Sequence, residues 1–250
     1  MMESLWLLFI LGIGAAIVGT LAGGGGLITL PMMIFLGIPI QTGIATNKFA
    51  SGLGSFSSIL YTLRKKEFSF SLIFQFILVS FIGGGIGSFI TSRLDEHVMN
   101  IVALVLLAGS LWLTFASKKW NYESSNVNTI EHQTLLDKGI LTGIGVYDGG
   151  FGPGSSTFAI LYFIKKGFTY VNSVQLARVL NFGSCLSAFI IFYMTGHFQW
   201  KIALTMAAAS IIGNQIGLRF AEYVPNKLAR IFLISVSVLL IVQVSLKLFV

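Results

Sequence analysis

The chain has 250 residues, of which 55% are hydrophobic and 10% are charged, and its mean hydropathy is +0.86. A soluble domain is about 25% charged and roughly 45–50% apolar, so this composition excludes a soluble enzyme, a disordered tail and a nucleic-acid binder. The net charge of +7 is interpreted as a signal of membrane orientation rather than as a phosphate-binding patch.

Apolar segments of membrane-spanning length follow one another along the chain. A helix needs about 20 apolar residues to cross a bilayer. Segments of that length lie at 5–22, 44–63, 70–92, 98–117, 174–194, 201–221 and 228–249. The first begins after Glu3, without the basic start of a cleavable signal. We therefore expect an all-α polytopic membrane protein with about 8–10 membrane segments.

Three further apolar segments, at 27–38, 139–148 and 155–164, are too short to cross. The first follows Gly23–Gly26, and the other two flank the glycine-rich stretch Asp148–Gly154. Short helices that meet at glycine turns indicate broken or re-entrant segments, which are tolerated at membrane depth where protein buries them or where they line a cavity. The polar segment around 119–137 is interpreted as a cytoplasmic linker between membrane repeats at 1–118 and 138–250.

The two halves align with each other. A shift of 130 residues places Lys48 on Arg178 and Ser80–Gly87 on Ser210–Gly217. A shift of 126 places Gly23, Gly24 and Gly26 on Gly149, Gly150 and Gly152. Both halves keep the order of glycine turn, internal cation, aromatic pair and glycine-rich helix. This common order indicates a duplication.

Loop charges predict the orientation of the repeats. With the Arg64–Lys66 loop in the cytoplasm, eleven Lys and Arg lie inside and three outside. The equivalent loops Arg64–Glu67 and Thr195–Gln199 then fall on opposite sides, and both termini lie outside. The repeats are therefore expected to be inverted, an arrangement in which many secondary transporters hold their substrate at the midplane.

Only Lys48, Asp148 and Arg178 are charged residues deep in the apolar segments. A charge at the bilayer centre costs roughly 2.5–3.5 kcal/mol even on the lower scales, so we expect a polar pathway. A buried salt bridge from Asp148 to Arg178 or Lys48 is the structural alternative, and either cation could instead snorkel from a helix end. For Asp148 three roles stay open: a proton carrier that couples transport, an ionised lock, or a role at the turn alone.

The polar neighbours of these charges favour an anion site. The helices after the glycine turns would present free N–H groups and positive dipole ends to the interior. Hydroxyls at the start of the second helix and amides beside each cation add donors. The predicted substrate-binding residues are Gly24, Gly25, Gly26, Asn47, Lys48, Gly152, Gly154, Ser155, Ser156, Arg178 and Asn181, with Asp148 as the coupling residue.

Other chemistry finds little support in the sequence. The three histidines lie in predicted loops without metal or protease spacing, and the single cysteine, Cys185, excludes an intrachain disulfide or a multi-cysteine zinc site. The glycines at 83–87, 213 and 217 are interpreted as helix-packing positions. We expect no catalytic residue, no metal and no cofactor. The expected partners are a small anion and the lipid bilayer, with no nucleic acid, and a homodimer stays open.

Several motifs together resemble the sulfite exporter TauE/SafE family, also called the toluene sulfonate uptake permeases. They are Gly23–Gly26 with Pro31, Ala45–Lys48, Tyr147–Gly154 and Gly196–Trp200, and the resemblance covers about Leu5 to Phe249. It implies about eight helices and transport of sulfite, sulfonates or sulfur-containing carboxylates across the cytoplasmic membrane. Arg178 departs from the lysine that family members often have, which keeps the charge and favours a planar, bidentate contact.

The leading hypothesis is a secondary transporter for a small sulfur-containing oxyanion. An anion channel on the same fold is one alternative. A membrane enzyme or a scaffold subunit is another, although the sequence offers no nucleophile–base pair and no metal cluster for an enzyme. The sequence leaves the substrate, the direction and the coupling ion open.

Overall fold

The structure is a computed structural model. It describes residues 2–23, 25–38, 40–93, 134–150, 152, 154–194 and 198–225, and isolated positions between 228 and 242. The predicted span at 98–117 lies outside the described residues, and the predicted linker and the span at 228–249 lie largely outside them. Statements below concern the described part.

The described residues form helices and contain no strand. The helices are α1 (Met2–Ala22), α2 (Gly25–Phe35), α3 (Ile40–Lys65), α4 (Phe70–Thr91), α6 (Leu135–Gly150), α7 (Ser155–Lys165), α8 (Tyr170–Tyr193) and α9 (Trp200–Ala221). Within this part, Leu5–Ala22, Phe70–Thr91 and Tyr170–Tyr193 are both long and apolar enough to cross a membrane. The all-helical membrane architecture is thus confirmed.

Two helices of 11 residues, α2 and α7, follow directly on α1 and α6. At about 1.5 Å per residue each spans roughly half of a 30 Å hydrocarbon core. Glycines with positive φ, a conformation that costs glycine little, break the chain before each of them: Gly23 at 84°, Gly152 at 88° and Gly154 at 82°. The predicted short segments therefore exist as separate helices.

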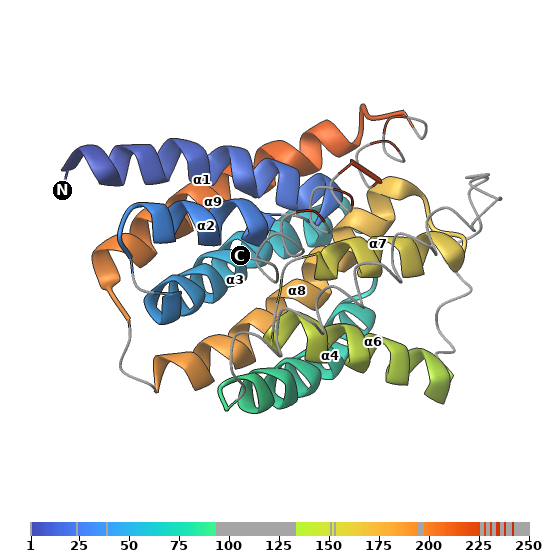
Figure 1. Ribbon diagram of the computed structural model, residues 1–250. Helices are drawn as coiled ribbons and strands as arrows, with labels where there is room; N and C mark the ends of the chain where they lie inside the picture. The colour runs from blue at the N-terminus through green and yellow to red at the C-terminus, as the bar shows by residue number, and fades with distance from the viewer. Residues whose placement is uncertain are drawn as a thin grey trace.

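The helices pack in an order that runs across the molecule (Figure 1). In it, α1 lies beside α9 along one edge, α4 lies beside α6 along the other, and α3 and α8 lie between these pairs. The central pair is antiparallel, because Phe49 contacts Phe189 while Phe56 contacts Phe182. Ser55, between the two phenylalanines of α3, bonds Asn181 of α8.

The two outer pairs pack through glycine in matching registers. A Cβ at Gly213 of α9 would meet Ala16 of α1, and one at Gly217 would meet Thr20. In the other pair, a Cβ at Gly83 of α4 would meet the backbone of Thr142, and one at Gly87 that of Val146. The shifts of 130 and 126 residues convert one set of contacts into the other. The predicted role of these glycines in close helix packing is confirmed.

Apolar side chains gather in two clusters toward opposite ends of α3 and α9. The larger includes Ile59 of α3 and Leu218 of α9, and the smaller includes Ala50 and Met206 of the same helices. Polar residues lie between these levels on both helices. The interior therefore has a polar layer between two apolar ones.

Candidate functional site

The two glycine turns meet in the polar layer. The Gly154 amide donates to the Gly23 carbonyl at 3.1 Å, and the Thr157 hydroxyl donates to the Ala22 carbonyl. The backbones are so close that a Cβ on Gly23 would overlap Thr157. The chain thus joins two breaks that are about 130 residues apart in sequence.

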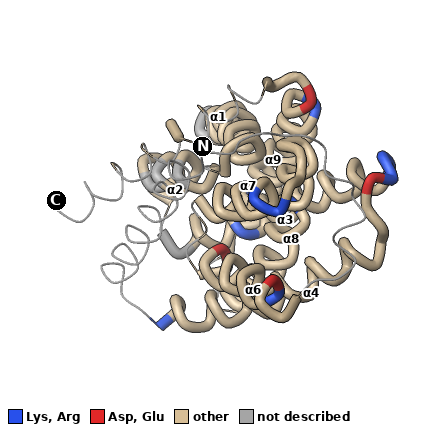
Figure 2. Tube along the Cα trace, turned by 90° about the vertical axis from the view of Figure 1, so that its right-hand side faces the viewer, with Lys and Arg blue, Asp and Glu red and all other residues tan. Residues whose placement is uncertain are grey.

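Three charged side chains are buried beside the joined turns. Lys48 of α3 is 2% exposed, Asp148 of α6 is 3% exposed and Arg178 of α8 is 6% exposed. Figure 2 shows that most other charged residues of the described part lie at helix ends and in loops. All three residues predicted to be charged within the membrane are therefore internal, and neither cation snorkels to an exposed end.

Asp148 accepts hydrogen bonds at both carboxylate oxygens. Ser155 Oγ donates to Oδ1 at 2.6 Å, and Asn181 Nδ2 donates to Oδ2 at 2.9 Å. The Ser184 hydroxyl also donates to Oδ2. Lys48 Nζ lies 3.9 Å from Oδ1 and donates to the backbone carbonyl of Asp148. The predicted salt bridge is thus made by Lys48, and the set of donors is suited to an ionised carboxylate.

Arg178 has no carboxylate partner within the described residues. Its Nη2 donates to the Gly19 carbonyl at 3.0 Å and to the Ser156 hydroxyl. Its Nε is buried and makes no hydrogen bond in the described part of the chain. A buried donor without an acceptor is rare in native proteins and costly. Arg178 therefore has the charge and a free donor with which to hold an anion.

The two asparagines have different partners. Asn47 Oδ1 accepts from Thr29 Oγ1 of α2 at 2.8 Å, whereas Asn181 Oδ1 accepts from Ser55 Oγ at 2.7 Å. Because Asn181 also donates to Asp148, it orients the carboxylate in addition to lying one turn from Arg178. Both amides are held in place by neighbouring helices.

The expectation of free amides at the start of α7 is wrong in part. The amide of Gly154 is bonded to Gly23, that of Ser155 to Gly152 at 3.1 Å, and that of Thr157 to Gly154 at 2.9 Å. These backbone carbonyls occupy donors that the sequence left available for a ligand. The polar groups that α7 presents are chiefly its serine hydroxyls, which already contact Arg178 and Asp148.

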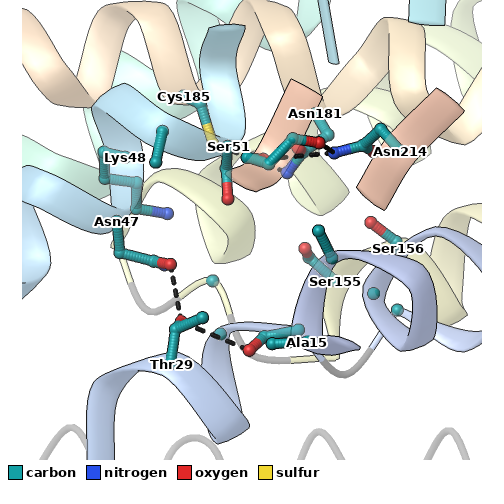
Figure 3. Close-up of a pocket in the computed structure, with 18 of the residues that line it drawn as sticks. Ala15, Thr29, Asn47, Lys48, Ser51, Ser155, Ser156, Asn181, Cys185 and Asn214 are labelled. Atoms are coloured by element: carbon teal, nitrogen blue, oxygen red, sulfur yellow. Dashed lines mark hydrogen bonds between the residues drawn. The ribbon is translucent and has the colours of Figure 1, made fainter. Parts of the chain in front are cut away.

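A cavity adjoins these groups (Figure 3). In the close-up, Asn47 and Lys48 approach it from one side, and Ser155 and Ser156 lie across from them. The predicted residues that line it are Gly25, Gly26, Asn47, Lys48, Asp148, Gly152, Ser155, Ser156, Arg178 and Asn181. Gly154 is not among its lining residues, and Gly24 lies outside the described residues.

The sequence analysis missed polar residues from α3 and α9. Ser51, Ser210 and Asn214 line the same cavity, and Asn214 Oδ1 accepts from Thr20 at 2.7 Å. The signal was present in the repeat: the register places Asn214 on Gly84, so an amide interrupts the second glycine motif. In the described part, no group of three His, Cys, Asp or Glu could hold a metal ion.

Comparisons with known proteins agree with this architecture. A sequence model of the family described as "Sulfite exporter TauE/SafE" matches residues 8–244. A probable membrane transporter protein of Haemophilus influenzae is 29% identical over 239 residues, 94% of this chain and 92% of that one. Probable membrane transporter proteins of a Sinorhizobium species (ORF9) and of Escherichia coli K12 (YfcA) are 30% and 27% identical and cover 94% and 93% of this chain, and 90% and 86% of their own lengths.

No solved structure matches the chain. The family match extends over nearly the whole sequence and includes both glycine turns, both buried cations and Asp148. The relatives are aligned over almost their full lengths and share the description of membrane transporter. The chain therefore belongs to the sulfite exporter TauE/SafE family of membrane transporters.

Proposed function

We propose that the protein is a secondary transporter that moves a small sulfur-containing oxyanion, such as sulfite, a sulfonate or a related organic anion, across the cytoplasmic membrane. The observation that carries this proposal is Arg178, a buried guanidinium that has neither a carboxylate partner nor an acceptor for its Nε among the described residues, and that lines a cavity between two broken helices. A planar guanidinium suits the oxygens of such an anion.

We propose further that the halves are inverted repeats with both termini outside. The antiparallel pairing of α3 and α8 supports this, because equivalent helices related by an axis in the membrane plane run in opposite directions. The matched glycine contacts of α1 with α9 and of α6 with α4 support it too.

Accessibility labelling tests the topology. Cys185 is buried, so a Cys185→Ser background can carry single cysteines at Arg64 and Gln199, both exposed. An impermeant thiol reagent added to intact cells should label Gln199→Cys and leave Arg64→Cys unlabelled until the membrane is opened. Labelling of both from the same side would refute the inverted arrangement.

For Asp148 we propose the ionised lock, with proton carriage as the competing proposal. The carboxylate binds two hydroxyls and one amide, and the Lys48 ammonium lies 3.9 Å away. All of these groups stabilise the charged form. A lock predicts that an imposed pH gradient, at zero membrane potential, does not drive uptake. Uptake that follows the gradient in the wild type and loses this response in Asp148→Asn would favour proton carriage.

Reconstitution into liposomes tests the function. A transporter exchanges labelled anion faster when unlabelled anion is present on the opposite side, whereas a channel shows no such stimulation and a scaffold subunit shows no flux.

Arg178→Ala should weaken anion binding by about 1.5–3 kcal/mol, the value of a charge-assisted hydrogen bond. Lys201→Ala, at an exposed helix end, is the matched control and should bind as the wild type does. Unchanged affinity in a folded Arg178→Ala variant would remove Arg178 from the site.

A further inference from the structure

We propose that Asp148 determines the charge of the anion that the site accepts, so that the protein binds a singly charged anion and rejects a doubly charged one of the same shape. This inference rests on the proposed function. It starts from the charged groups that line the cavity in the described part of the chain, which are Lys48, Arg178 and Asp148. Two cations and one carboxylate give a net charge of +1.

The remaining polar groups at the cavity do not change this count. They are hydroxyls and amides, with Cys185 as the other titratable group. Asp148 contributes its negative charge because ammonium, amide and hydroxyl groups surround it. Lys48 is balanced by that carboxylate, whereas Arg178 is balanced by nothing in the described residues. The site thus offers one uncompensated positive charge.

The repeat shows why Asp148 is the deciding residue. Both halves carry an internal cation, Lys48 in the first and Arg178 in the second. The shift of 126 residues that aligns the glycine turns places Ala22 on Asp148, so only the second half carries a carboxylate at this position. Two symmetric halves would offer a charge of +2. Asp148 lowers this value to +1.

The consequence concerns anions buried between the helices. A singly charged anion neutralises the cavity, whereas a doubly charged one leaves a net negative charge next to Asp148. Like charges a few Å apart repel strongly away from bulk water, and an unbalanced buried charge is costly. Methanesulfonate and sulfate are a suitable pair of probes because both are tetrahedral about sulfur, and a methyl group in one replaces an oxygen of the other. The wild type should prefer methanesulfonate.

The first test raises the net charge of the cavity. Equilibrium dissociation constants for methanesulfonate and sulfate are measured on purified protein at pH 8. The wild type should bind methanesulfonate at least about tenfold more tightly. Asp148→Asn raises the net charge to +2 and should shift the ratio toward sulfate by at least about tenfold. The double variant Lys48→Met/Asp148→Asn returns the charge to +1 without an unpaired buried carboxylate, and should restore the preference for methanesulfonate.

The second test lowers the net charge of the cavity and leaves Asp148 in place. Ser156 accepts a hydrogen bond from Arg178, so Ser156→Asp places a carboxylate against the unpaired guanidinium and lowers the net charge to zero. It should lose at least about tenfold in methanesulfonate affinity. Ser156→Asn is the neutral counterpart of the same shape, so the difference in methanesulfonate affinity between Ser156→Asp and Ser156→Asn measures the effect of the added charge alone. Because a paired charge replaces an unpaired one, Ser156→Asp should fold even if Asp148→Asn does not.

The outcomes separate this inference from the proposed function. Wild-type protein that binds neither of these anions at pH 8, nor the singly charged hydrogensulfite supplied at pH 6, contradicts the proposed function itself. Wild-type protein that binds sulfate as tightly as methanesulfonate contradicts the charge filter alone. A folded Asp148→Asn variant with an unchanged ratio, or a Ser156→Asp variant that binds like Ser156→Asn, overturns the role assigned to the charge count.

Discussion

The two halves of the protein hold their internal cations in the same way but surround them differently. Lys48 of the first half donates to the carbonyl of Asp148, near the end of α6, and Arg178 of the second half donates to the carbonyl of Gly19, near the end of α1. Each cation therefore reaches the broken helix of the opposite half. Only Lys48 finds a carboxylate there. The shared contacts join the halves, and the difference leaves one cation available to a ligand.

The largest expected effect comes from exchanging each cation for a methionine. Lys48→Met leaves Asp148 without its cation, which should cost about 3–5 kcal/mol in the free energy of unfolding. Arg178→Met removes a buried charge that has no carboxylate partner in the described residues, so stability should change by less than about 1 kcal/mol. Anion binding should weaken by about 1.5–3 kcal/mol, as in Arg178→Ala. Denaturation in detergent checks both values. Equal losses of stability would contradict the difference between the halves.

A smaller effect is expected at the glycines that join α4 to α6 and α9 to α1. A Cβ at Gly87 would overlap the backbone of Val146 and lie 2.9 Å from the Gly150 amide. One at Gly217 would meet the side chain of Thr20, with Cβ at 2.8 Å. Backbone yields less than a side chain, so Gly87→Ala should cost about 2–3 kcal/mol and Gly217→Ala about 1–2 kcal/mol.

The ranking of the two glycine variants can be checked by thermal unfolding of purified protein. Gly14→Ala is a control, because a Cβ there meets nothing within 4 Å, and it should unfold as the wild type does. If Gly217→Ala were the more damaging variant, the two packed pairs would differ in a way that the matched registers do not explain.

The hydroxyls that join the short helices to their surroundings should have an effect comparable to that of the glycines. Thr157 donates to the Ala22 carbonyl and Thr29 donates to Asn47 Oδ1 at 2.8 Å. Valine keeps the shape and removes the donor, which leaves a buried acceptor unsatisfied at a cost of about 1–3 kcal/mol. Thr157→Val should lie at the upper end because it loosens the contact between the two turns, and Thr29→Val at the lower end. Anion affinity measured alongside stability would show whether the turns also shape the site.

Much of the fold could be predicted because length and hydropathy act locally. The ends of α4 and α9 lie within one residue of the predicted segments, since a bilayer dictates the length of an apolar helix. The pairing of α1 with α9 and of α4 with α6 was not predicted. The pairing depends on which glycine surface meets which backbone. The glycine pattern predicts that a close helix contact exists, but it does not identify the partner helix.

The charged residues at the candidate site could be predicted from the sequence, whereas their partners and hydrogen bonds largely could not. Charges within apolar segments are rare enough to identify Lys48, Asp148 and Arg178 from sequence alone. The choice of Lys48 as the partner of Asp148 depends on side-chain geometry across three helices. Residue spacing along a single helix carries no information about that geometry. The bonded amides of Gly154 and Ser155 were missed for a related reason, because the meeting of two distant turns decides them.

The smallest expected effect concerns two lysine–carboxylate pairs near helix ends. Lys65 at the end of α3 pairs with Glu222 beyond α9 and so links the halves, whereas Lys166, directly after α7, pairs with Asp137 in the first turn of α6. Lys166 and the Tyr162 hydroxyl hold the pKa of Asp137 well below its usual range, and Lys65 and Tyr61 lower the pKa of Glu222. A carboxyl whose pKa is lower in the folded state stabilises the fold above its unfolded pKa of about 4, and this contribution disappears as the pH falls through the folded value.

Both pairs are half exposed to solvent at the lysine, so screening limits each to about 1 kcal/mol or less at pH 7. Asp137→Asn and Glu222→Gln should each lose that amount, and each should converge with the wild type below pH 4, over a lower range for Asp137 because its pKa is lowered further. Raised salt should reduce both differences. For both variants, unfolding is measured from pH 3 to pH 8 and anion exchange is measured in parallel. The exchange rates then compare the pair that links the halves with the pair at the start of α6. Glu222→Gln should alter anion exchange more than Asp137→Asn does. Of the two pairs, Lys65–Glu222 is the one that links helices of different halves, and in transporters with inverted repeats one half commonly rocks against the other.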